Sequence, residues 1–566
     1  MSENGNKTGA KRILLAGDTT LDPLGRVLER SQDAPQVTAS AASYGQVYQI
    51  LLDQNHPAWE FKPDVLVVWT TAHLTLPSLG KLLRFDSKSA SDAYDETLRE
   101  VEQFAEAVVR AAGRVGLLLV PAWVLPHHER WIQSLTWRHG IGPANLIAKA
   151  NLILAEKFAA HQNIVLMDAG YWQASLGKPV YDPRMYAVAK ILYSPSLFEK
   201  AAAEIKSVIR GTLGQVKKVI VCDLDNTLWG GVVGDDGAHN IKLGAPDPVG
   251  ECFHAFQKAL KGLRSRGILL TISSKNEEKY ALSVIEEHPS MVLRKSDFVA
   301  WRINWIDKAK NISELADELN LGLDSFVFLD DSPQERDQVR QLLPQVYTPD
   351  LPASPADLAA FVCSLNCFET PSLGTEDFER TDMYQAERGR KEMLDLSGDV
   401  ENWLQSLQVQ VRAAPLRRES LARAAQLLNK TNQFNLGLRR MDEKSLWDWA
   451  EEPCNSTYTF HVSDRFGDFG LTGLASVSLA EGEAKIVDFV MSCRVMGKKV
   501  EEALLGYTLA QANAAGAQRI VAPPFDGPRN GPAKSFFATK FSSGESAAID
   551  PARVGIPPQI SLMEES

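Results

Sequence analysis

Two aspartates one residue apart, Asp223 and Asp225, directly follow a short apolar segment at residues 219–222. Side chains alternate between the two faces of a strand, so residues i and i+2 point the same way. We therefore expect both carboxylates at the carboxyl end of a strand, where open α/β sheets bind their ligands. Two like charges this close are costly unless a cation or a shared proton compensates them. A hard divalent ion such as Mg²⁺ meets that need, although an isolated pair of this kind could also simply cap the next helix.

Polar residues suited to binding phosphate or metal recur at three later positions. They are Ser274, Lys275, Asn276, Lys308, Asp330 and Asp331. The hydroxyl and donors after the apolar segment 268–272 suit a phosphate oxygen, and the aspartate pair after the apolar segment 325–329 suits a metal ion. Lys308 alone would be an ordinary surface lysine. Its place between these two motifs makes it a candidate for phosphate binding.

The elements that must position these side chains follow a regular pattern. Apolar segments of strand length alternate with amphipathic helical stretches such as 252–266 and 308–319. This alternation is typical of βαβ units and predicts a parallel sheet. Because the carboxyl ends of parallel strands meet at one edge of the sheet, we expect the polar residues to gather in a single site.

In their order, these motifs resemble those of the haloacid dehalogenase (HAD) superfamily of phosphotransferases, over roughly residues 215–350. The string DLDNTLWGGVVGDDG at 223–237 is similar to the FkbH-like branch, whose members act as glyceryl transferase/phosphatases in polyketide pathways. The strings NWIDK at 304–308 and FLDDSP at 328–333 match that branch too. Asp307 stands where the family usually has proline, which should matter little because the lysine contacts the phosphate.

The resemblance implies how the reaction would proceed. Asp223 would attack phosphorus and form an aspartyl-phosphate, which divides one difficult hydrolysis into two easier steps. Asp225 would protonate the leaving oxygen and then activate water, so it must lie within hydrogen-bond reach of both. Ser274 and Lys308 would hold the phosphoryl oxygens and offset the charge of the transition state.

The resemblance also implies a Mg²⁺ cofactor. Its ligands would be Asp223, the backbone carbonyl of Asp225 and the Asp330–Asp331 pair, with Asp331 preferred over Asp330 as the direct ligand. Oxygen ligands of this kind are those that Mg²⁺ takes in proteins.

The spacing of the motifs leaves no room for a cap domain. Between Ser274 and Lys308 there is space for a helix, a short strand and a loop, and the glycine-rich residues 229–237 predict a small flap. A capped phosphatase closes over a small metabolite to exclude water. We therefore expect an open site that accepts a large substrate, such as a group presented by a carrier protein or by another domain of the chain.

Length and composition place this region inside a larger protein. A chain of 566 residues should hold three or four domains, and contents of 45% hydrophobic and 23% charged residues are ordinary for a globular protein. The net charge of −11 argues against nucleic acid as a general partner. We expect no membrane partner, because no apolar run approaches spanning length. The polar start of the chain and six scattered cysteines favour the cytoplasm and free thiols.

Residues 1–210 predict a parallel-sheet domain of their own. The string RILLAGDTT at 12–20 resembles the start of the SGNH hydrolase fold, and residues 64–69 and 115–120 continue the strand pattern. A threonine, Thr19 or Thr20, stands where the nucleophilic serine would be, and the other expected catalytic residues are absent. We expect a domain used for docking rather than catalysis.

The residues beyond about 370 differ in character. Strand-like runs occur at 457–462, 473–479 and 485–491. A long helix follows them, opening near Arg494, and this order resembles the GNAT acyltransferase fold, in which a helix N-terminus and loop amides bind a pyrophosphate. Lys499 stands where the usual pattern has glycine or alanine, and its bulk should impede pyrophosphate binding. A phosphate of the substrate or of a phosphopantetheine arm could still bind at this helix start.

A cysteine at this strand–helix junction could carry an acyl group. Cys493 lies beside Arg494 and near two lysines, and a helix N-terminus with neighbouring cations lowers the pKa of a thiol. An isolated cysteine is more often a small core residue. The similarity of SCRVMG at 492–497 to the same family, together with the need for an acyl acceptor, favours Cys493. Cys222 is the alternative acceptor, although strand alternation should point it into the sheet packing.

The combined prediction is three α/β domains. They are a flavodoxin/SGNH-like parallel sheet at 1–210, a HAD Rossmann-like sheet without a large cap at 211–370 and a GNAT-like mixed α+β domain at 371–566. The resemblance implies an enzyme that takes the glyceryl group of 1,3-bisphosphoglycerate, removes phosphate with Mg²⁺ and loads glyceryl onto an acyl carrier protein for polyketide-type biosynthesis. The alternative is a plain Mg²⁺-dependent phosphatase whose flanking domains recruit a partner.

Overall fold

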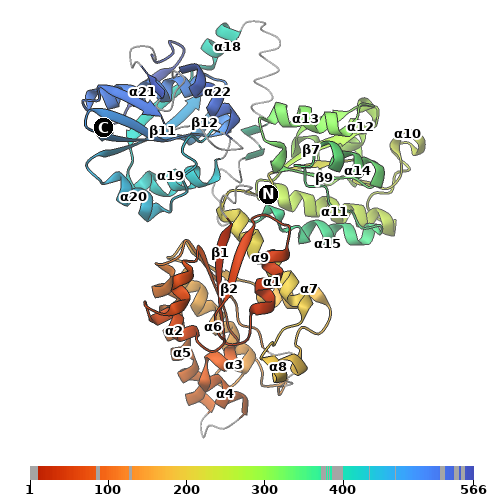
Figure 1. Ribbon diagram of the computed structural model, residues 1–566. Helices are drawn as coiled ribbons and strands as arrows, with labels where there is room; N and C mark the ends of the chain where they lie inside the picture. Colours follow the sequence, from red (N-terminus) through yellow and green to blue (C-terminus); the bar gives the residue numbers. More distant parts are fainter. Residues whose placement is uncertain are drawn as a thin grey trace, which may run out of the picture. The chain divides into compact units, whose positions relative to one another are not determined.

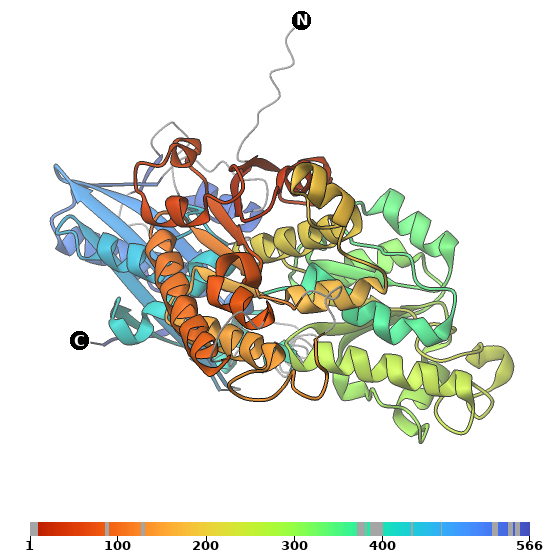
Figure 2. The same ribbon diagram turned by 90° about the horizontal axis from the view of Figure 1, so that it is seen from below.

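The protein forms two compact units, Met1–Arg210 and Gly211–Ser566, which hold three separate sheets. The first unit is coloured red to yellow and the second yellow-green to blue (Figures 1 and 2). The computed structural model describes residues 10–84, 90–125, 131–370, 378, 380–381, 383–384, 400–431, 434–465, 467–522, 530–540, 547–549 and 555–565. Among these residues, none of the helices has the length and apolar character needed to span a bilayer.

The first unit is built on a five-stranded parallel sheet with the order β2-β1-β3-β4-β5. Its strands are β1 Lys11–Gly17, β2 Val37–Ala41, β3 Val65–Trp69, β4 Leu117–Pro121 and β5 Ile164–Met167. The central strand β3 is buried at every position, as a strand covered on both faces must be. The strand order reverses between β1 and β3, which is the flavodoxin-like arrangement that the sequence predicts.

Helices lie between these strands and after the last of them. They are α1 Asp22–Arg30, α2 Val47–Leu52, α3 Ala72–Thr75, α4 Pro77–Arg84, α5 Ala90–Ala112, α6 Pro143–Phe158, α7 Ala169–Leu176, α8 Pro183–Ala189 and α9 Pro195–Thr212. Because each parallel connection must return to the same end of the sheet, the residues that follow β1, β3, β4 and β5 gather at the carboxyl edge.

The second unit begins with a four-stranded parallel sheet in the order β8-β7-β6-β9. The strands are β6 Val219–Cys222, β7 Leu269–Ser274, β8 Phe298–Ile303 and β9 Phe326–Leu329. The helices are α10 Val233–Asp236, α11 Pro248–Ser265, α12 Glu278–Glu287, α13 Lys308–Leu319, α14 Pro333–Leu342 and α15 Pro355–Ser364. Cys222 pairs with Leu329, so the residues that follow β6 and β9 leave the sheet side by side.

No cap domain interrupts this sheet. Residues 131–370 are described throughout, and the connection from β6 to β7 contains only the one-turn α10 and the helix α11. The connection from β7 to β8 contains α12 and a short 3₁₀ turn, Lys295–Asp297. The prediction of a HAD-like sheet without a large cap is therefore confirmed.

Asp307, which departs from the expected proline, has a local role at the start of α13. Its Oδ1 accepts hydrogen bonds from the backbone N–H groups of Ala309 at 2.8 Å and Lys310 at 3.3 Å. A carboxylate in this position satisfies orphan N–H groups and complements the helix dipole. The substitution thus fixes the start of the helix that carries Lys308.

The remaining sheet of the second unit is mixed and seven-stranded, in the order β15-β14-β13-β12-β11-β10-β16. Its strands are β10 Gln410–Pro415, β11 Asn455–Asp464, β12 Gly467–Ala480, β13 Glu483–Met491, β14 Arg519–Ala522, β15 Ala547–Ile549 and β16 Ser561–Glu564. The helices of this part are α18 Val400–Leu407, α19 Arg418–Lys430, α20 Glu443–Ala450, α21 Val500–Ala514 and α22 Gly531–Lys540.

The long helix α21 connects β13 to its parallel neighbour β14 and belongs to the core beneath the sheet. Leu504 and Leu505 of α21 share that core with Phe460 and Phe489 of the strands. A meander of antiparallel strands followed by a helix and a parallel strand is the mixed α+β arrangement that the sequence predicts for this part of the chain.

Candidate active site

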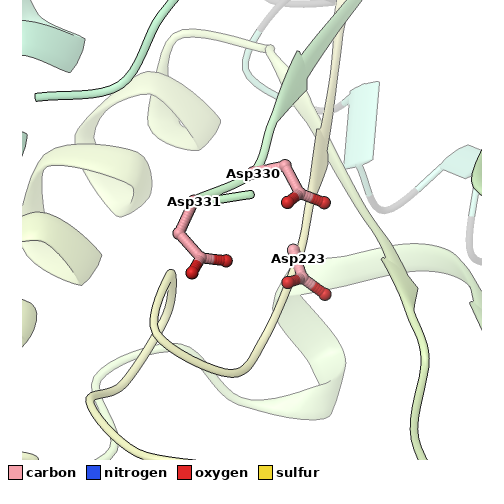
Figure 3. Close-up of side chains that lie close together, drawn as sticks. All are labelled: Asp223, Asp330 and Asp331. Carbon is pink, nitrogen blue, oxygen red and sulfur yellow. The ribbon is translucent and has the colours of Figure 1, made fainter. Parts of the chain in front are cut away.

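Three carboxylates meet where β6 and β9 end. Asp223 follows β6, and Asp330 and Asp331 follow β9. One oxygen from each lies within 4.8 Å of the others (Figure 3). Asp223 and Asp330 are buried, whereas Asp331 is exposed, so the cluster is open to solvent on one side. The register of the two strands, which pairs Cys222 with Leu329, explains this convergence.

Among the described residues, Lys308 is the cation that forms ion pairs with these carboxylates. Its Nζ lies 3.0 Å from Asp223 Oδ1 and also donates a hydrogen bond to Asp330 Oδ2. The side chain is only 3% exposed, so Lys308 is not a surface lysine. Burial opposes its charge, but the negative charges of Asp223 and Asp330 outweigh that effect and raise the pKa of Lys308. The ammonium is therefore a fixed positive charge inside the site.

One lysine does not compensate three carboxylates. Burial raises the pKa of Asp330 to about 6, and the negative charge of Asp223 adds to this effect. The pKa of Asp331 is raised by the same two causes, burial first. The cluster therefore carries excess negative charge, which a bound divalent cation would stabilise.

The residues of the cluster fit Mg²⁺. All of the available donors are hard carboxylate oxygens, and no sulfur or imidazole belongs to the described cluster. Mg²⁺ commonly keeps several waters and uses one or two carboxylates, and the exposed Asp331 leaves room for such waters. Asp223, Asp330 and Asp331 are the residues that would hold the ion.

Asp225 lies outside this cluster and is held by three donors. Its Oδ1 accepts from Trp229 Nε1 at 2.8 Å and from the Val233 N–H at 3.1 Å, and its Oδ2 accepts from Asn276 Nδ2 at 2.8 Å. Burial nevertheless raises the pKa of Asp225 above its ordinary value. A carboxyl group fixed in place with a raised pKa is suited to holding and releasing a proton.

Ser274, Lys275 and Asn276, at the end of β7, are predicted to bind phosphate. Two of these side chains bond to other protein groups in the structure. Asn276 donates to Asp225, and the Lys275 Nζ forms an ion pair with Glu335 Oε1 at 2.6 Å. Ser274 is the last residue of β7 and is 2% exposed. Its backbone carbonyl accepts from the Asn304 N–H at 3.0 Å, which fixes the loop leading to Lys308.

Two residues that sequence reasoning missed hold the Asp330–Asp331 pair. The Thr227 hydroxyl accepts from the Asp331 N–H at 3.0 Å and lies 3.4 Å from Asp331 Oδ1. Arg336 Nη1 donates to the backbone carbonyls of Asp330 at 2.7 Å and Asp331 at 2.8 Å. A cation close to the N-terminus of a helix opposes the helix dipole, and this was the available signal that Arg336 has another role.

The alternative acyl acceptor Cys222 is poorly suited to nucleophilic attack. It is 1% exposed and belongs to the core of its sheet. Burial raises the pKa of its thiol well above the ordinary value, and the charges of Asp223 and Asp330 raise it further. The reactive thiolate is therefore disfavoured at this position.

Cys493 and Arg494 follow a strand of a different sheet from the one that carries the carboxylates. They begin the 3₁₀ turn Cys493–Val495, between β13 and α21, and the Cys493 side chain lies outside those described. Lys499 is the N-cap residue of α21, has a left-handed backbone with φ of 59°, and its Nζ pairs with Glu401 Oε1 at 3.0 Å. The groups that the structure brings together are thus the three clustered aspartates and Lys308.

Comparisons with known proteins found no matching family model and no matching curated protein. Among solved structures, the N-terminal part of BF1531 from Bacteroides fragilis, which contains a phosphatase domain and was solved in complex with Mg, is 30% identical with a TM-score of 0.58. That match covers 64% of this chain and 95% of the other.

Two acetyltransferase structures also match a smaller part of the chain. The ribosomal-protein-S18-alanine N-acetyltransferase from Escherichia coli is 12% identical with a TM-score of 0.19, over 25% of this chain and 90% of the other. The IAA acetyltransferase from Bacillus cereus is 14% identical with a TM-score of 0.18, over 24% of this chain and 79% of the other.

Proposed function

We propose a phosphatase function for this chain, which belongs to the same family as the phosphatase-containing N-terminal part of BF1531. Residues 211–370 would form a Mg²⁺-dependent phosphatase domain of the HAD type. The observation that carries the proposal is the cluster of Asp223, Asp330 and Asp331 around the buried ammonium of Lys308. A strand-end carboxylate beside a fixed cation is the arrangement that phosphoryl transfer through an aspartyl-phosphate requires.

The side chains have distinct tasks in this reaction. An Asp223 oxygen forms a bond to phosphorus as the bond from phosphorus to the ester oxygen breaks. Asp225 gives its proton to the departing oxygen and then takes a proton from the water that hydrolyses the intermediate. The Lys308 ammonium offsets charge on the phosphoryl oxygens. Bound Mg²⁺ supplies further neutralisation of that charge.

The finer proposal couples this phosphatase to acyl transfer. The acyl-phosphate at C1 of 1,3-bisphosphoglycerate is already activated, so a thiolate can attack the carbonyl carbon and expel phosphate without ATP. The C3 phosphate is an ordinary ester whose removal calls for the phosphatase site. Cys493 would carry the glyceryl group as a thioester until the phosphopantetheine thiol of an acyl carrier protein accepts it, and Arg494 would help to hold the substrate phosphate.

The absence of a cap supports a substrate of this kind. Residues 211–370, all of which are described, contain no inserted cap domain, and Asp331 is exposed. A glyceryl group attached to a protein or to a carrier arm could therefore reach Asp223. A small metabolite would gain more from a closed site that excludes water.

Intact-mass measurement of the full chain after incubation with 1,3-bisphosphoglycerate and Mg²⁺ tests the proposal. The unmodified chain should gain a glyceryl adduct. Asp223→Asn should accumulate an adduct that retains phosphate, because an amide cannot form the aspartyl-phosphate. Cys493→Ala should gain no adduct yet keep Mg²⁺-dependent hydrolysis of p-nitrophenyl phosphate. Cys454→Ala, which removes an exposed cysteine, is the matched control and should behave as the unmodified chain does.

Two results would contradict the finer proposal in different ways. Phosphate release without any glyceryl adduct would support the alternative, a plain phosphatase whose flanking domains recruit a partner. If Cys493→Ala gained the glyceryl adduct normally and Cys222→Ala did not, the buried thiol of Cys222 would be the acyl acceptor.

A further inference from the structure

The two carboxylate oxygens of Asp225 are bonded differently. Oδ1 accepts two hydrogen bonds, from Trp229 Nε1 at 2.8 Å and from the Val233 N–H at 3.1 Å. Oδ2 accepts one, from Asn276 Nδ2 at 2.8 Å. A carboxylate oxygen has two lone pairs, so the described residues saturate Oδ1 and leave one lone pair of Oδ2 unused. Oδ2 is therefore the oxygen that can hold a proton.

The amide of Asn276 is oriented as a donor by the residue that follows it. Its Oδ1 accepts from the Glu277 N–H at 3.1 Å, and its Nδ2 faces Asp225. In this orientation Asn276 cannot accept a proton from Oδ2, so a proton on that oxygen lies along the other lone pair. Asp225 is only partly buried, which leaves its side chain accessible to a substrate oxygen.

Trp229 cannot turn away from Asp225 at low cost. Its side chain is completely buried and belongs to the core of the sheet that carries the site. A buried indole N–H needs a hydrogen-bond partner, and Asp225 Oδ1 is that partner. Rotation of the ring would leave a buried donor unsatisfied.

The backbone that follows Trp229 is held in place as well. The Gly230 N–H donates to the Lys242 carbonyl at 3.1 Å, and the Lys242 N–H donates to the Gly230 carbonyl at 2.8 Å. The Gly231 N–H donates to Asn226 Oδ1 at 2.9 Å. The segment that presents the indole is thus fixed on both sides of the tryptophan.

We propose that Trp229 is a positioning residue that selects Oδ2 of Asp225 as the oxygen that exchanges the catalytic proton. This inference rests on the proposed phosphatase function and adds a residue that acts through Asp225. By occupying Oδ1, the indole prevents the carboxyl group from presenting that oxygen to the substrate.

The selected oxygen serves both steps of the reaction. In the first step, the Oδ2 proton moves to the ester oxygen as the bond from phosphorus to that oxygen breaks and the bond from Asp223 to phosphorus forms. In the second step, the attacking water gives a proton to Oδ2. Its oxygen bonds to phosphorus and the Asp223 oxygen leaves, so the protonated Asp225 and the ionised Asp223 are both restored.

Trp229→Phe tests this role, because it keeps most of the buried ring and removes the N–H donor. The measurement is kcat/KM at saturating Mg²⁺ with two aromatic esters, benzyl phosphate and p-nitrophenyl phosphate. Benzyl alkoxide leaves poorly without a proton, so kcat/KM for benzyl phosphate should fall by about tenfold or more. p-Nitrophenolate leaves without a proton, so kcat/KM for its ester should stay within about threefold.

The second step gives a further readout with p-nitrophenyl phosphate. In Trp229→Phe the phosphoenzyme should form normally and then wait for a base that takes the proton of water. Both kcat and KM should therefore fall by the same factor, and the fraction of phosphoenzyme trapped by acid at steady state should rise. A tryptophan with a merely structural role would instead lower kcat/KM for both esters alike.

Trp301→Phe is the matched control. It removes an indole N–H that donates to an exposed carboxylate oxygen, Glu278 Oε1, at 2.8 Å, so it should match the unmodified chain with both esters. Adding Trp229→Phe to Asp225→Asn should cause no further loss with benzyl phosphate, because the tryptophan acts through Asp225. If Trp229→Phe does not fold, benzothienylalanine at this position keeps the shape of indole, lacks the N–H and should give the same result.

The positioning role and the phosphatase function can fail separately. Equal losses with the two esters, no loss with benzyl phosphate, or a further loss in the Asp225→Asn background would overturn the role of Trp229 and leave Asp223 as the nucleophile. Absence of phosphoenzyme from the unmodified chain, or turnover by Asp223→Asn, would overturn the phosphatase function and this inference with it.

Discussion

At the scale of single residues, the candidate site depends on the ion pairs that Lys308 forms with two carboxylates. Its ammonium contacts Asp223 and Asp330, and both carboxylates are buried. Removing one partner from a buried ionic cluster leaves an uncompensated charge and is strongly destabilising. Lys275, by contrast, pairs with Glu335 where its side chain is 38% exposed, and such surface pairs contribute little. The two lysines of the candidate site should therefore respond very differently to substitution.

Lys308→Met should lower kcat for p-nitrophenyl phosphate by at least about 100-fold, because the charge on the transferred phosphoryl group loses its fixed cation. Lys275→Met should stay within about threefold of the unmodified chain. Steady-state kinetics at saturating Mg²⁺ compares the two variants. If the Lys275 variant were the one to lose activity, the phosphate would be held by the residues after β7 and not by Lys308.

The sequence identified the clustered aspartates and Lys308 because their spacing follows directly from strand ends in a parallel sheet. It did not reveal that Asn276 and Trp229 hold Asp225, since those bonds depend on how residues 229–237 fold back over the strand end. Nor did it reveal what Arg336 binds: its place near a helix N-terminus hints at another role, but its partners are backbone carbonyls, which carry no signal in the sequence.

At the scale of elements, α14 holds the loop that carries Asp330 and Asp331 through the side chain of Arg336. Arg336 is 6% exposed, and one of its nitrogens bonds both carbonyls of the Asp330–Asp331 pair. Residues that orient metal ligands in this way commonly change metal affinity by 10–100-fold when they are substituted. Arg340, about one helix turn further along α14, bonds the Thr348 carbonyl and surface aspartates instead.

Arg336→Lys should weaken Mg²⁺ binding by about 10–100-fold, because a lysine keeps the charge but lacks the Nη1 group that bonds both carbonyls. Calorimetric Mg²⁺ titration measures the affinity, and saturating Mg²⁺ should restore most of kcat. Arg340→Lys is the matched control on the same helix and should bind Mg²⁺ as before. Equal Mg²⁺ affinity in the Arg336 variant and the unmodified chain would show that α14 does not position the metal ligands.

Element boundaries were predictable where the hydrophobic pattern is strong. The helix predicted at 308–319 matches α13, and the strand runs at 457–462, 473–479 and 485–491 lie inside β11, β12 and β13. The strand predicted at 268–272 continues to Ser274, because parallel pairing with β8 extends through polar residues that the pattern treats as a loop. The sequence also predicts a helix around residues 377–396, most of which lie outside the described residues.

At the scale of the whole molecule, the chain carries three sheets, and the phosphatase-like sheet is the second of them in sequence order. The length of the chain predicted several domains. The alternation of apolar strands with helices predicted the two parallel sheets, and the strand-like runs beyond residue 370 predicted the mixed sheet. The function proposed for the phosphatase-like sheet depends on one claim, that Asp223 is a covalent nucleophile.

Acid-quench trapping of the phosphoenzyme tests that claim most directly. The full chain is mixed with Mg²⁺ and a ³²P-labelled acyl phosphate such as acetyl phosphate, quenched in acid, and digested. The account predicts an acid-stable, hydroxylamine-labile label on the peptide that contains Asp223, which is lost when Mg²⁺ is chelated and absent from Asp223→Asn. Sustained phosphate release by Asp223→Asn, or a label on any other residue, would contradict the account.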